Sequence, residues 1–154
     1  PFTFSEIGDA SLVAVTKGGA CIHCPKEPPD YAHAATAPAP GSFDATLKLG
    51  ANVGLLFFGL AAPRKVLTKS GYIRYDKDVW LYGAKYGNLY ANGKQQGTAE
   101  KLPPGAEVRL VYDAGEATLR FLRGERLLGQ LEGVVPNPKI VVSMYSAGNG
   151  AEFV

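Results

Sequence analysis

The sequence predicts an all-β protein, a single antiparallel β-sandwich of two sheets with little helix. The chain has 154 residues, of which 46% are hydrophobic and 19% charged, and this composition suits one globular domain with a substantial core. Glycine (19) and proline (11) are spread along the whole chain, which favours many short strands joined by turns over long helices. Strand patterns recur about every 8–12 residues, as in sandwiches and barrels. The sequence has no internal repeat of about 20–50 residues, so it does not indicate a propeller or solenoid.

The first predicted strands flank a proline-rich loop. Ser11–Lys17 predicts a strand that ends at a Gly-Gly pair, and Ala20–Cys24 can pair back with it across that turn. The segment 25–42 holds five prolines, so we expect a loop there with at most one helical turn, at Tyr31–Ala35. In Phe43–Leu49 apolar and polar side chains alternate, which predicts a strand with one buried and one solvated face.

The next strand is of a different kind, because it is apolar almost throughout. Asn52–Ala61 lacks the alternation of the preceding strand, so we expect both of its faces to be covered. Its apolar run ends at Pro63 and is far shorter than the roughly 20 residues that a membrane-spanning helix needs. We therefore expect no membrane partner.

The second half of the chain reads as a series of hairpins. The expected strands are Val79–Ala84, Asn88–Asn92, Glu107–Asp113, Ala117–Arg123, Arg126–Gly133 and Lys139–Ser146. In the first of these, Trp80 and Tyr82 share one face while Leu81 and Gly83 share the other. Aromatic pairs across strands commonly stabilise a sheet, so we interpret these rings mainly as structural filling. Asn92-Gly93 supplies the positive φ that a tight hairpin turn requires.

Cysteine and histidine residues are candidate metal ligands. Cys21, His23 and Cys24 lie together, with His33 a distant fourth candidate, but a structural zinc site normally uses two ligand pairs and no second cysteine pair exists. Period two also puts Cys21 and His23 on the opposite face of a strand from Cys24. We expect no metal and no cofactor. Two cysteines are too few for a disulfide framework, which favours an intracellular and cytoplasmic origin.

The sequence predicts a non-catalytic protein. Neither of the two histidines stands in a nucleophile elbow or a metalloprotease helix motif, and the glycine-rich GNGAEF lacks the features of a phosphate loop. The net charge of +2 is too small to indicate nucleic-acid binding by charge alone.

The loop Arg64–Asp78 carries the most distinctive composition. It interleaves five basic residues with two tyrosines and is longer than an ordinary connection between strands. Rings among positive charges could stack on single-stranded RNA. A peptide ligand is favoured, because tyrosine and arginine are enriched at the hot spots of protein interfaces.

Four blocks of the chain resemble the SPRY domain family. They are FDATLKL with ANVGLLF, then DVWLYGAKYGNLYANGK, then AEVRLVYDAGEATLRFLRGERLLGQL, and finally NPKIVVSMYSAGNGAEFV. In the third block Asp113, Gly115, Leu119, Phe121, Gly124 and Leu128-Gly129 fall in register with the family pattern. The four blocks stand in the family's order, so the resemblance implies a SPRY-like sandwich of the concanavalin type over residues 11–154, with residues 1–10 as a lead-in.

The resemblance also implies a function in protein interaction, through loops at one end of the sandwich. Carried over by position, the surface would combine the loop near Lys26 and Tyr31, the loop with Arg64 and Tyr72–Tyr75, and the turn after Met144. The expected partner-binding residues are Lys26, Tyr31, Arg64, Tyr72, Ile73, Arg74, Tyr75, Met144, Tyr145 and Ser146. The arginines would donate to a ligand carboxylate or carbonyl, and the tyrosines would supply flat contact area.

The expected partner is therefore a protein or a short peptide. Family members serve as partner-recognition domains, for example in ubiquitin ligases and scaffolds, so we expect a monomeric domain of a larger chain. Two other readings stay open. A carbohydrate-binding module would use an exposed Trp80 or Tyr82 as a stacking platform, and an RNA-binding module would lose affinity steeply with salt.

Overall fold

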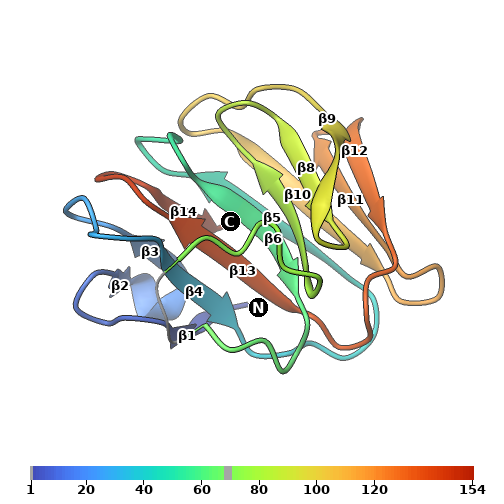
Figure 1. The fold of residues 1–154 in the computed structure, drawn as a ribbon, viewed down its shortest axis with the longest axis horizontal. Helices are drawn as coiled ribbons and strands as arrows, with labels where there is room; N and C mark the ends of the chain where they lie inside the picture. Colours follow the sequence, from blue (N-terminus) through green and yellow to red (C-terminus); the bar gives the residue numbers. More distant parts are fainter. Residues whose placement is uncertain (1, 68–70) are drawn as a thin grey trace.

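Short strands joined by turns make up almost the whole computed structural model, which describes residues 2–67 and 71–154 (Figure 1). The first sheet contains, in spatial order, β1 (Phe4–Ile7), β4 (Ala32–Thr36), β13 (Lys139–Met144), β6 (Phe57–Ala61), β7 (Val79–Gly83), β8 (Asn88–Ala91) and β9 (Lys94–Thr98). The second sheet contains β12 (Arg126–Glu132), β11 (Thr118–Arg123), β10 (Glu107–Asp113), β5 (Phe43–Leu49), β14 (Gly150–Phe153), β3 (Cys21–His23) and β2 (Ala14–Thr16). Neighbouring strands are antiparallel throughout, and the 3₁₀ turn η1 (Lys17–Gly19) is the only helical element in these ranges.

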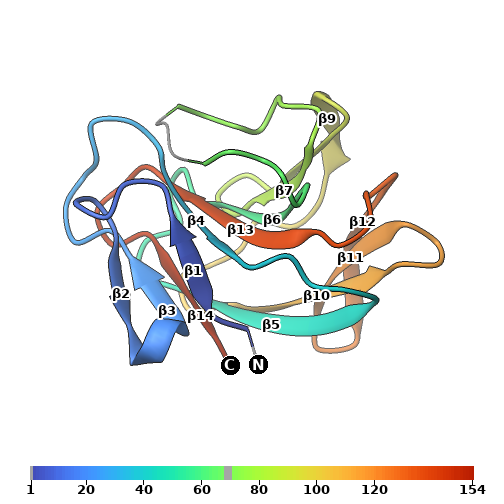
Figure 2. The same ribbon diagram turned by 90° about the horizontal axis from the view of Figure 1, so that it is seen from below.

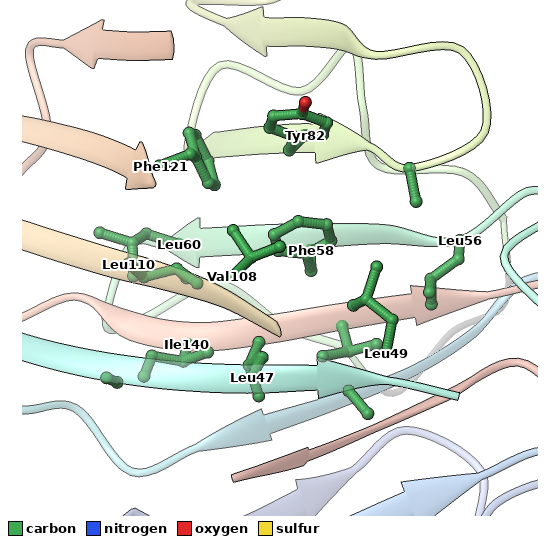
Figure 3. Packing of buried hydrophobic residues seen from close by; sticks show 14 of the residues in the cluster. Leu47, Leu49, Leu56, Phe58, Leu60, Tyr82, Val108, Leu110, Phe121 and Ile140 are labelled. Atoms are coloured by element: carbon green, nitrogen blue, oxygen red, sulfur yellow. The ribbon is translucent and has the colours of Figure 1, made fainter. Parts of the chain in front are cut away.

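The two sheets face each other as the layers of a sandwich, which is seen edge-on in Figure 2. Their inner faces enclose one large apolar core, part of which is shown in Figure 3. Phe58 of β6 stacks on Tyr82 of β7 at 5.4 Å between ring centroids, and Phe121 of β11 meets both rings edge-on from the opposite sheet. Trp80 is buried beside them and donates from its indole N–H to the Glu132 carbonyl. The aromatic residues of β7 are therefore core residues, as the sequence analysis expected.

The outer face of the first sheet is covered as well. Residues 62–78, here called the strap, leave β6 and return to β7 across this face; of the strap, the structure describes residues 62–67 and 71–78 (Figure 2). Leu67 and Ile73 of the strap pack on outward-facing side chains of the sheet such as Leu81 and Val141. Because of this cover, every residue of β4, β6, β7 and β13 is buried.

Buried polar groups hold the strap on the sheet. Lys139 of β13, which is 3% exposed, donates from Nζ to the carbonyl of Lys65 at 2.7 Å and forms an ion pair with Glu6 of β1. His33 of β4 lies 2.8 Å from the Gly71 carbonyl through Nε2. A carbonyl can only accept, so Nε2 carries the proton in this contact. Burial is the main reason that the pKa of His33 is lowered from its ordinary value.

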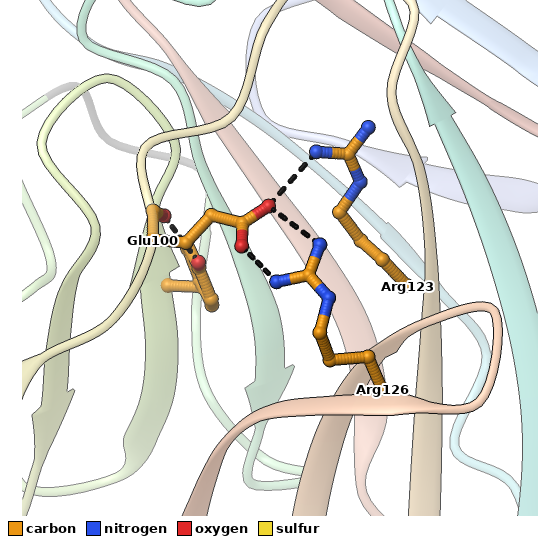
Figure 4. Close-up of polar contacts among 4 residues, drawn as sticks. Glu100, Arg123 and Arg126 are labelled. Atoms are coloured by element: carbon orange, nitrogen blue, oxygen red, sulfur yellow. Dashed lines mark hydrogen bonds and ion pairs between the residues drawn. The ribbon is translucent and has the colours of Figure 1, made fainter.

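An ion-pair clamp connects the segment after β9 with the second sheet. Glu100 accepts hydrogen bonds from Arg126 and Arg123, which lie at the β11–β12 hairpin (Figure 4). The hydrogen bonds from these two arginines lower the pKa of Glu100 to about 2. The Glu100 carbonyl accepts the hydroxyl of the buried Tyr82, whose pKa burial raises to about 12. This segment is thus tied to both sheets.

Most of the predicted strands are confirmed, but β1, β4 and β9 were not predicted, since the polar residues after Gly93 were expected to form a loop. The loop expected over residues 25–42, with at most one helical turn at Tyr31–Ala35, is wrong in its middle, because Ala32–Thr36 forms β4 between β1 and β13. All five residues of this strand are buried, and four of them are the small residues alanine and threonine, so the strand shows no polar–apolar alternation. Within the ten residues expected to be a lead-in, Phe4–Ile7 forms the edge strand β1, and Phe4 is buried. No helix in the described ranges is long and apolar enough to span a bilayer.

Candidate functional site

Aromatic side chains gather on the covered face of the first sheet, at the end where β13 finishes and β6 begins. Tyr31 stands just before β4 and Tyr145 just after β13, and the antiparallel register pairs Ala32 with Met144. The two tyrosine rings therefore lie side by side, stacked at 4.5 Å between centroids with 21° between their planes. Tyr31 is almost fully buried, whereas Tyr145 is half-buried and keeps part of its ring at the surface.

Arg74 of the strap is enclosed by this group of rings. Its guanidinium carbon lies 5.1 Å from the ring centroid of Phe57, 5.0 Å from that of Tyr72 and 5.5 Å from that of Tyr75. These distances are within the range of cation–π attraction. Nη1 donates to the hydroxyl of Tyr31 at 3.1 Å. Nε is buried without a hydrogen-bond partner in the described part of the chain.

The charge of Arg74 is kept despite its partial burial. Burial by itself lowers the pKa of the guanidinium, but the hydrogen bond to Tyr31 and the neighbouring tyrosine hydroxyls outweigh it, so the pKa is raised. No carboxylate among the described residues forms an ion pair with it. A positive charge is thus held at the surface by rings rather than by an acid.

Exposed and buried side chains alternate in the part of the strap around Arg74. Tyr72 and Tyr75 are 57% and 48% exposed, whereas Ile73 between them is buried against the sheet. Tyr75 also meets Tyr90 of β8 edge-on at 5.6 Å, which fixes the position of its ring. We call Tyr31, Tyr72, Arg74, Tyr75 and Tyr145 the aromatic cluster. It combines rigid ring surface with one fixed cation.

Comparison with known proteins shows which fold carries this cluster. The structure superimposes on the SPRY domain of human HERC1 with a TM-score of 0.75 over 96% of each chain, at 22% sequence identity. The fold is that of a SPRY domain. A second human SPRY domain gives a TM-score of 0.77 over 97% of this chain and 96% of that one, at 15% identity.

Two further structures superimpose on this chain. The TRIM65 PSpry domain gives a TM-score of 0.72 over 99% of this chain and 91% of its own, at 12% identity. Stonustoxin gives 0.75 over 99% of this chain but only 27% of its own length, at 14% identity. No protein-family model matches the sequence, and no curated protein matches it either.

The SPRY fold brings some of the expected site residues together and separates others. Tyr31, Tyr72, Arg74, Tyr75 and Tyr145 form the aromatic cluster, although Tyr31 is mostly covered by it. Their contact with a ligand stays a prediction.

Three of the remaining expected residues are buried or distant. Met144 cannot contact a partner, because its side chain points into the sandwich core and its Sδ lies 3.9 Å from the Cys24 thiol. Ile73 is buried on the side of the strap that faces the sheet. Arg64 is exposed but follows the far end of β6, where Ala61 pairs with Lys139, so the length of the strand separates it from the cluster.

The last two expected residues lie on the loops beside the cluster. Ser146 is half-buried in the turn after β13, with its backbone N–H bound to the side chain of Asn149. Lys26 is exposed on the loop between β3 and β4, and in the described ranges it forms no ion pair. Their contact with a ligand also stays a prediction.

One positioning residue was missed by sequence reasoning. Asn149 is fully buried, and its Oδ1 accepts the backbone N–H groups of Tyr145 and Ser146 at 2.9 and 3.0 Å. Its Nδ2 donates to the carbonyls of Asn52 and Gly54 at 2.8 and 3.0 Å. These four hydrogen bonds fix the turn that carries Tyr145. The signal available in the sequence was the AGNG turn, in which a polar side chain stands between glycines.

The residues considered for other chemistry occupy structural positions. Cys21 and Cys24 are free thiols on opposite faces of their segment, with Cys24 in the core. Across the described part of the chain, no three acidic, cysteine or histidine side chains lie close enough to hold a metal ion. Trp80 and Tyr82 are buried, so neither can act as the stacking platform that a carbohydrate-binding module would need.

Proposed function

We propose that this protein is a non-catalytic interaction module that binds a short peptide or a protein surface at the aromatic cluster. The observation that carries the proposal is Arg74, a cation that is held among three rings and has an unpaired buried Nε. A buried donor without a partner costs free energy in the unbound state. A ligand that supplies the missing acceptor removes this cost.

The neighbours of Arg74 suit a peptide ligand. Tyr72 and Tyr75 offer large exposed rings whose positions are already fixed by edge-to-face contacts, so little side-chain entropy is lost on binding. Tyrosine and arginine are the side chains found most often at interface hot spots. The proposed contact residues are thus Tyr72, Arg74, Tyr75 and Tyr145, with Lys26 and Ser146 at the rim.

The wider role is also a proposal. The resemblance of the chain to SPRY domains supports a part in a larger protein, such as a ubiquitin ligase or a scaffold, in which this domain selects the partner. Its two free thiols support an intracellular setting.

Selection from a library of random peptides displayed on phage tests the proposal. Peptides enriched on the immobilised protein should bind Tyr75→Ala and Tyr145→Ala at least about tenfold more weakly, which is a usual hot-spot effect. Leu127→Ala is the control, since Leu127 is about as exposed as Tyr75 (53% and 48%) but lies on β12 of the other sheet. Circular dichroism should show that all three variants are folded.

Unchanged affinity in both tyrosine variants would remove the aromatic cluster from the site. A failure to enrich any peptide, together with binding to a glycan array or to salt-sensitive RNA, would replace the peptide proposal by one of those ligands.

A further inference from the structure

A pocket of about 270 Å³ opens beside Arg74, between the strap and the β7–β8 turn. Arg74 and Tyr75 line it from the strap, Lys85 and Tyr86 from the turn, and Phe57 and Tyr90 from the sheet. Pockets for drug-sized ligands generally range from about 300 to 1,000 Å³. This pocket is smaller, so its size suits one side chain of a larger ligand.

All charged side chains that line the pocket are positive. Arg74 and Lys85 are its only charged lining residues, and no carboxylate lines it. Lys85 is exposed, with Nζ 5.4 Å from the ring centroid of Tyr86, and it forms no ion pair within the described ranges. Two cations and no acid therefore line this pocket, one cation from the strap and one from the turn.

Arg74 differs in this respect from the other cations that are withdrawn from solvent. The described chain has five lysines and arginines that are buried or half-buried. Four of them have a carboxylate partner, and these pairs are Lys65 with Asp76, Arg109 with Asp44, Arg123 with Glu100 and Lys139 with Glu6. Arg74 is the fifth and has none. The fold thus supplies an acid wherever such a cation is structural, and leaves it out at this pocket.

The Nε–Nη2 edge of the Arg74 guanidinium has the geometry for a carboxylate. Nη1 donates to the hydroxyl of Tyr31, and Nε, whose N–H is parallel to one N–H of Nη2, has no hydrogen-bond partner among the described residues. A carboxylate takes such a pair with both oxygens, and this bidentate contact is among the strongest hydrogen-bonded pairs in proteins. In addition, Asn88 donates to the Tyr90 hydroxyl at 3.3 Å, so the tyrosine proton is available to an acceptor in the pocket.

We propose that this pocket binds an aspartate or glutamate side chain of the peptide held by the aromatic cluster. The inference rests on the proposed function, since it specifies one position of that same ligand. Arg74 would form the bidentate contact, and Lys85 would add a second positive charge from the rim.

The peptides enriched on the wild-type protein provide the test. They should share an acidic residue at one fixed position, and replacing it with Asn or Gln should weaken binding by about 30-fold or more, as when one partner of a buried charge pair is removed. Selection on Lys85→Glu should lose this acidic residue and favour Lys or Arg there. Lys94→Glu is the control, because Lys94 is an exposed cation of the same sheet whose neighbour Gln95 lines the pocket while Lys94 does not.

The outcomes separate this inference from the proposed function. Peptides that depend on Tyr75 and Tyr145 but share no acidic position would overturn the pocket assignment and leave the peptide-binding function intact. A phosphoserine peptide that binds tighter than the glutamate peptide would overturn the choice of a carboxylate. Peptides insensitive to both tyrosine variants would overturn the function, and the pocket assignment with it.

Discussion

The two outer faces of the sandwich are built on opposite principles. On the second sheet, β5 and β10 alternate, so that Asp44, Lys48 and Glu107 point to solvent, and Arg109 pairs with Asp44 at 2.6 Å. On the first sheet, the strap covers the outer face, and four adjoining strands are buried on both sides.

The difference shows how the fold produces a site. On an uncovered antiparallel face, the polar side chains are hydrogen-bonded by water or form ion pairs across neighbouring strands. A covered face must instead satisfy buried polar groups from within, and His33, Lys139 and Arg74 are all on or beneath the strap. The rings and Arg74 reach the surface at one end of the covered face, where β13 ends and β6 begins, and the candidate site lies there.

The largest expected effect is on the unfolding free energy, when the same leucine-to-alanine substitution is made on each of the two faces. Leu81→Ala on the covered face should cost about 2–5 kcal/mol of unfolding free energy, because Leu81 is fully buried and its loss leaves a cavity. Leu122→Ala on the uncovered face should cost about 1 kcal/mol or less, because Leu122 is half-exposed. Urea unfolding of both variants measures the difference. Equal losses would show that the strap adds no burial energy.

The cover should also make stability depend on pH. The lowered pKa of His33 means that the folded state keeps it neutral, while the unfolded chain takes up a proton below about pH 6.5. This contribution is therefore present above that pH and lost as the pH falls, by at most about 1.4 kcal/mol per pH unit. Urea unfolding between pH 7.5 and 5 should show the loss, and His33→Gln should lack it. His23→Gln, on the uncovered face, is the control that should keep it.

A smaller effect is expected for the contact that orients Arg74. Tyr31→Phe removes the acceptor of Nη1 and should lower the unfolding free energy by about 1 kcal/mol. Peptide affinity, measured by calorimetry, should fall by a few-fold as well. Tyr112→Phe loses a hydrogen bond to the Val135 carbonyl in the core, so it should lower stability without changing affinity. If both variants kept full affinity, the Tyr31 hydroxyl would have no part in the site.

The smallest effect is expected at the exposed clamp. Glu100→Gln should lower the thermal midpoint slightly, and the difference should disappear at about 1 M salt, where surface charges are screened. Because the folded pKa of Glu100 is about 2, its contribution is present above about pH 4.3, the unfolded value, and is lost as the pH falls toward 2. Glu116→Gln removes an exposed carboxylate that forms no ion pair in the described chain, so it should change nothing. A loss at Glu100 that persisted in salt would assign the clamp a role beyond electrostatics.

Much of the fold could be predicted from local patterns. The alternation in Phe43–Leu49 and the apolar run before Pro63 gave β5 and β6, and the Asn92-Gly93 turn has the positive φ values that join β8 to β9. The expected placement of Trp80 and Tyr82 on one face is confirmed. The strand β4 was missed, because a row of alanines and flanking prolines shows neither periodicity nor β-propensity.

The site was predictable only in part. The composition of the strap singled out Tyr72, Arg74 and Tyr75, which are neighbours in the chain. That Tyr145 stacks on Tyr31, and that Met144 points inward while Tyr145 does not, depends on strand register. Lys85 and Tyr86 were not proposed, because their turn reaches Arg74 only after the sheet has formed.

The sequence by itself determined the class of fold, because period-two patterns, turn residues and glycine positions act over a few residues. It also determined that the strap would be basic and aromatic. Only the tertiary structure decided that the strap lies on the first sheet, that Arg74 has rings instead of a carboxylate, and that a pocket opens beside it. The physical reason is that these features arise from contacts between segments far apart in the chain, whose energies depend on packing rather than on local preference.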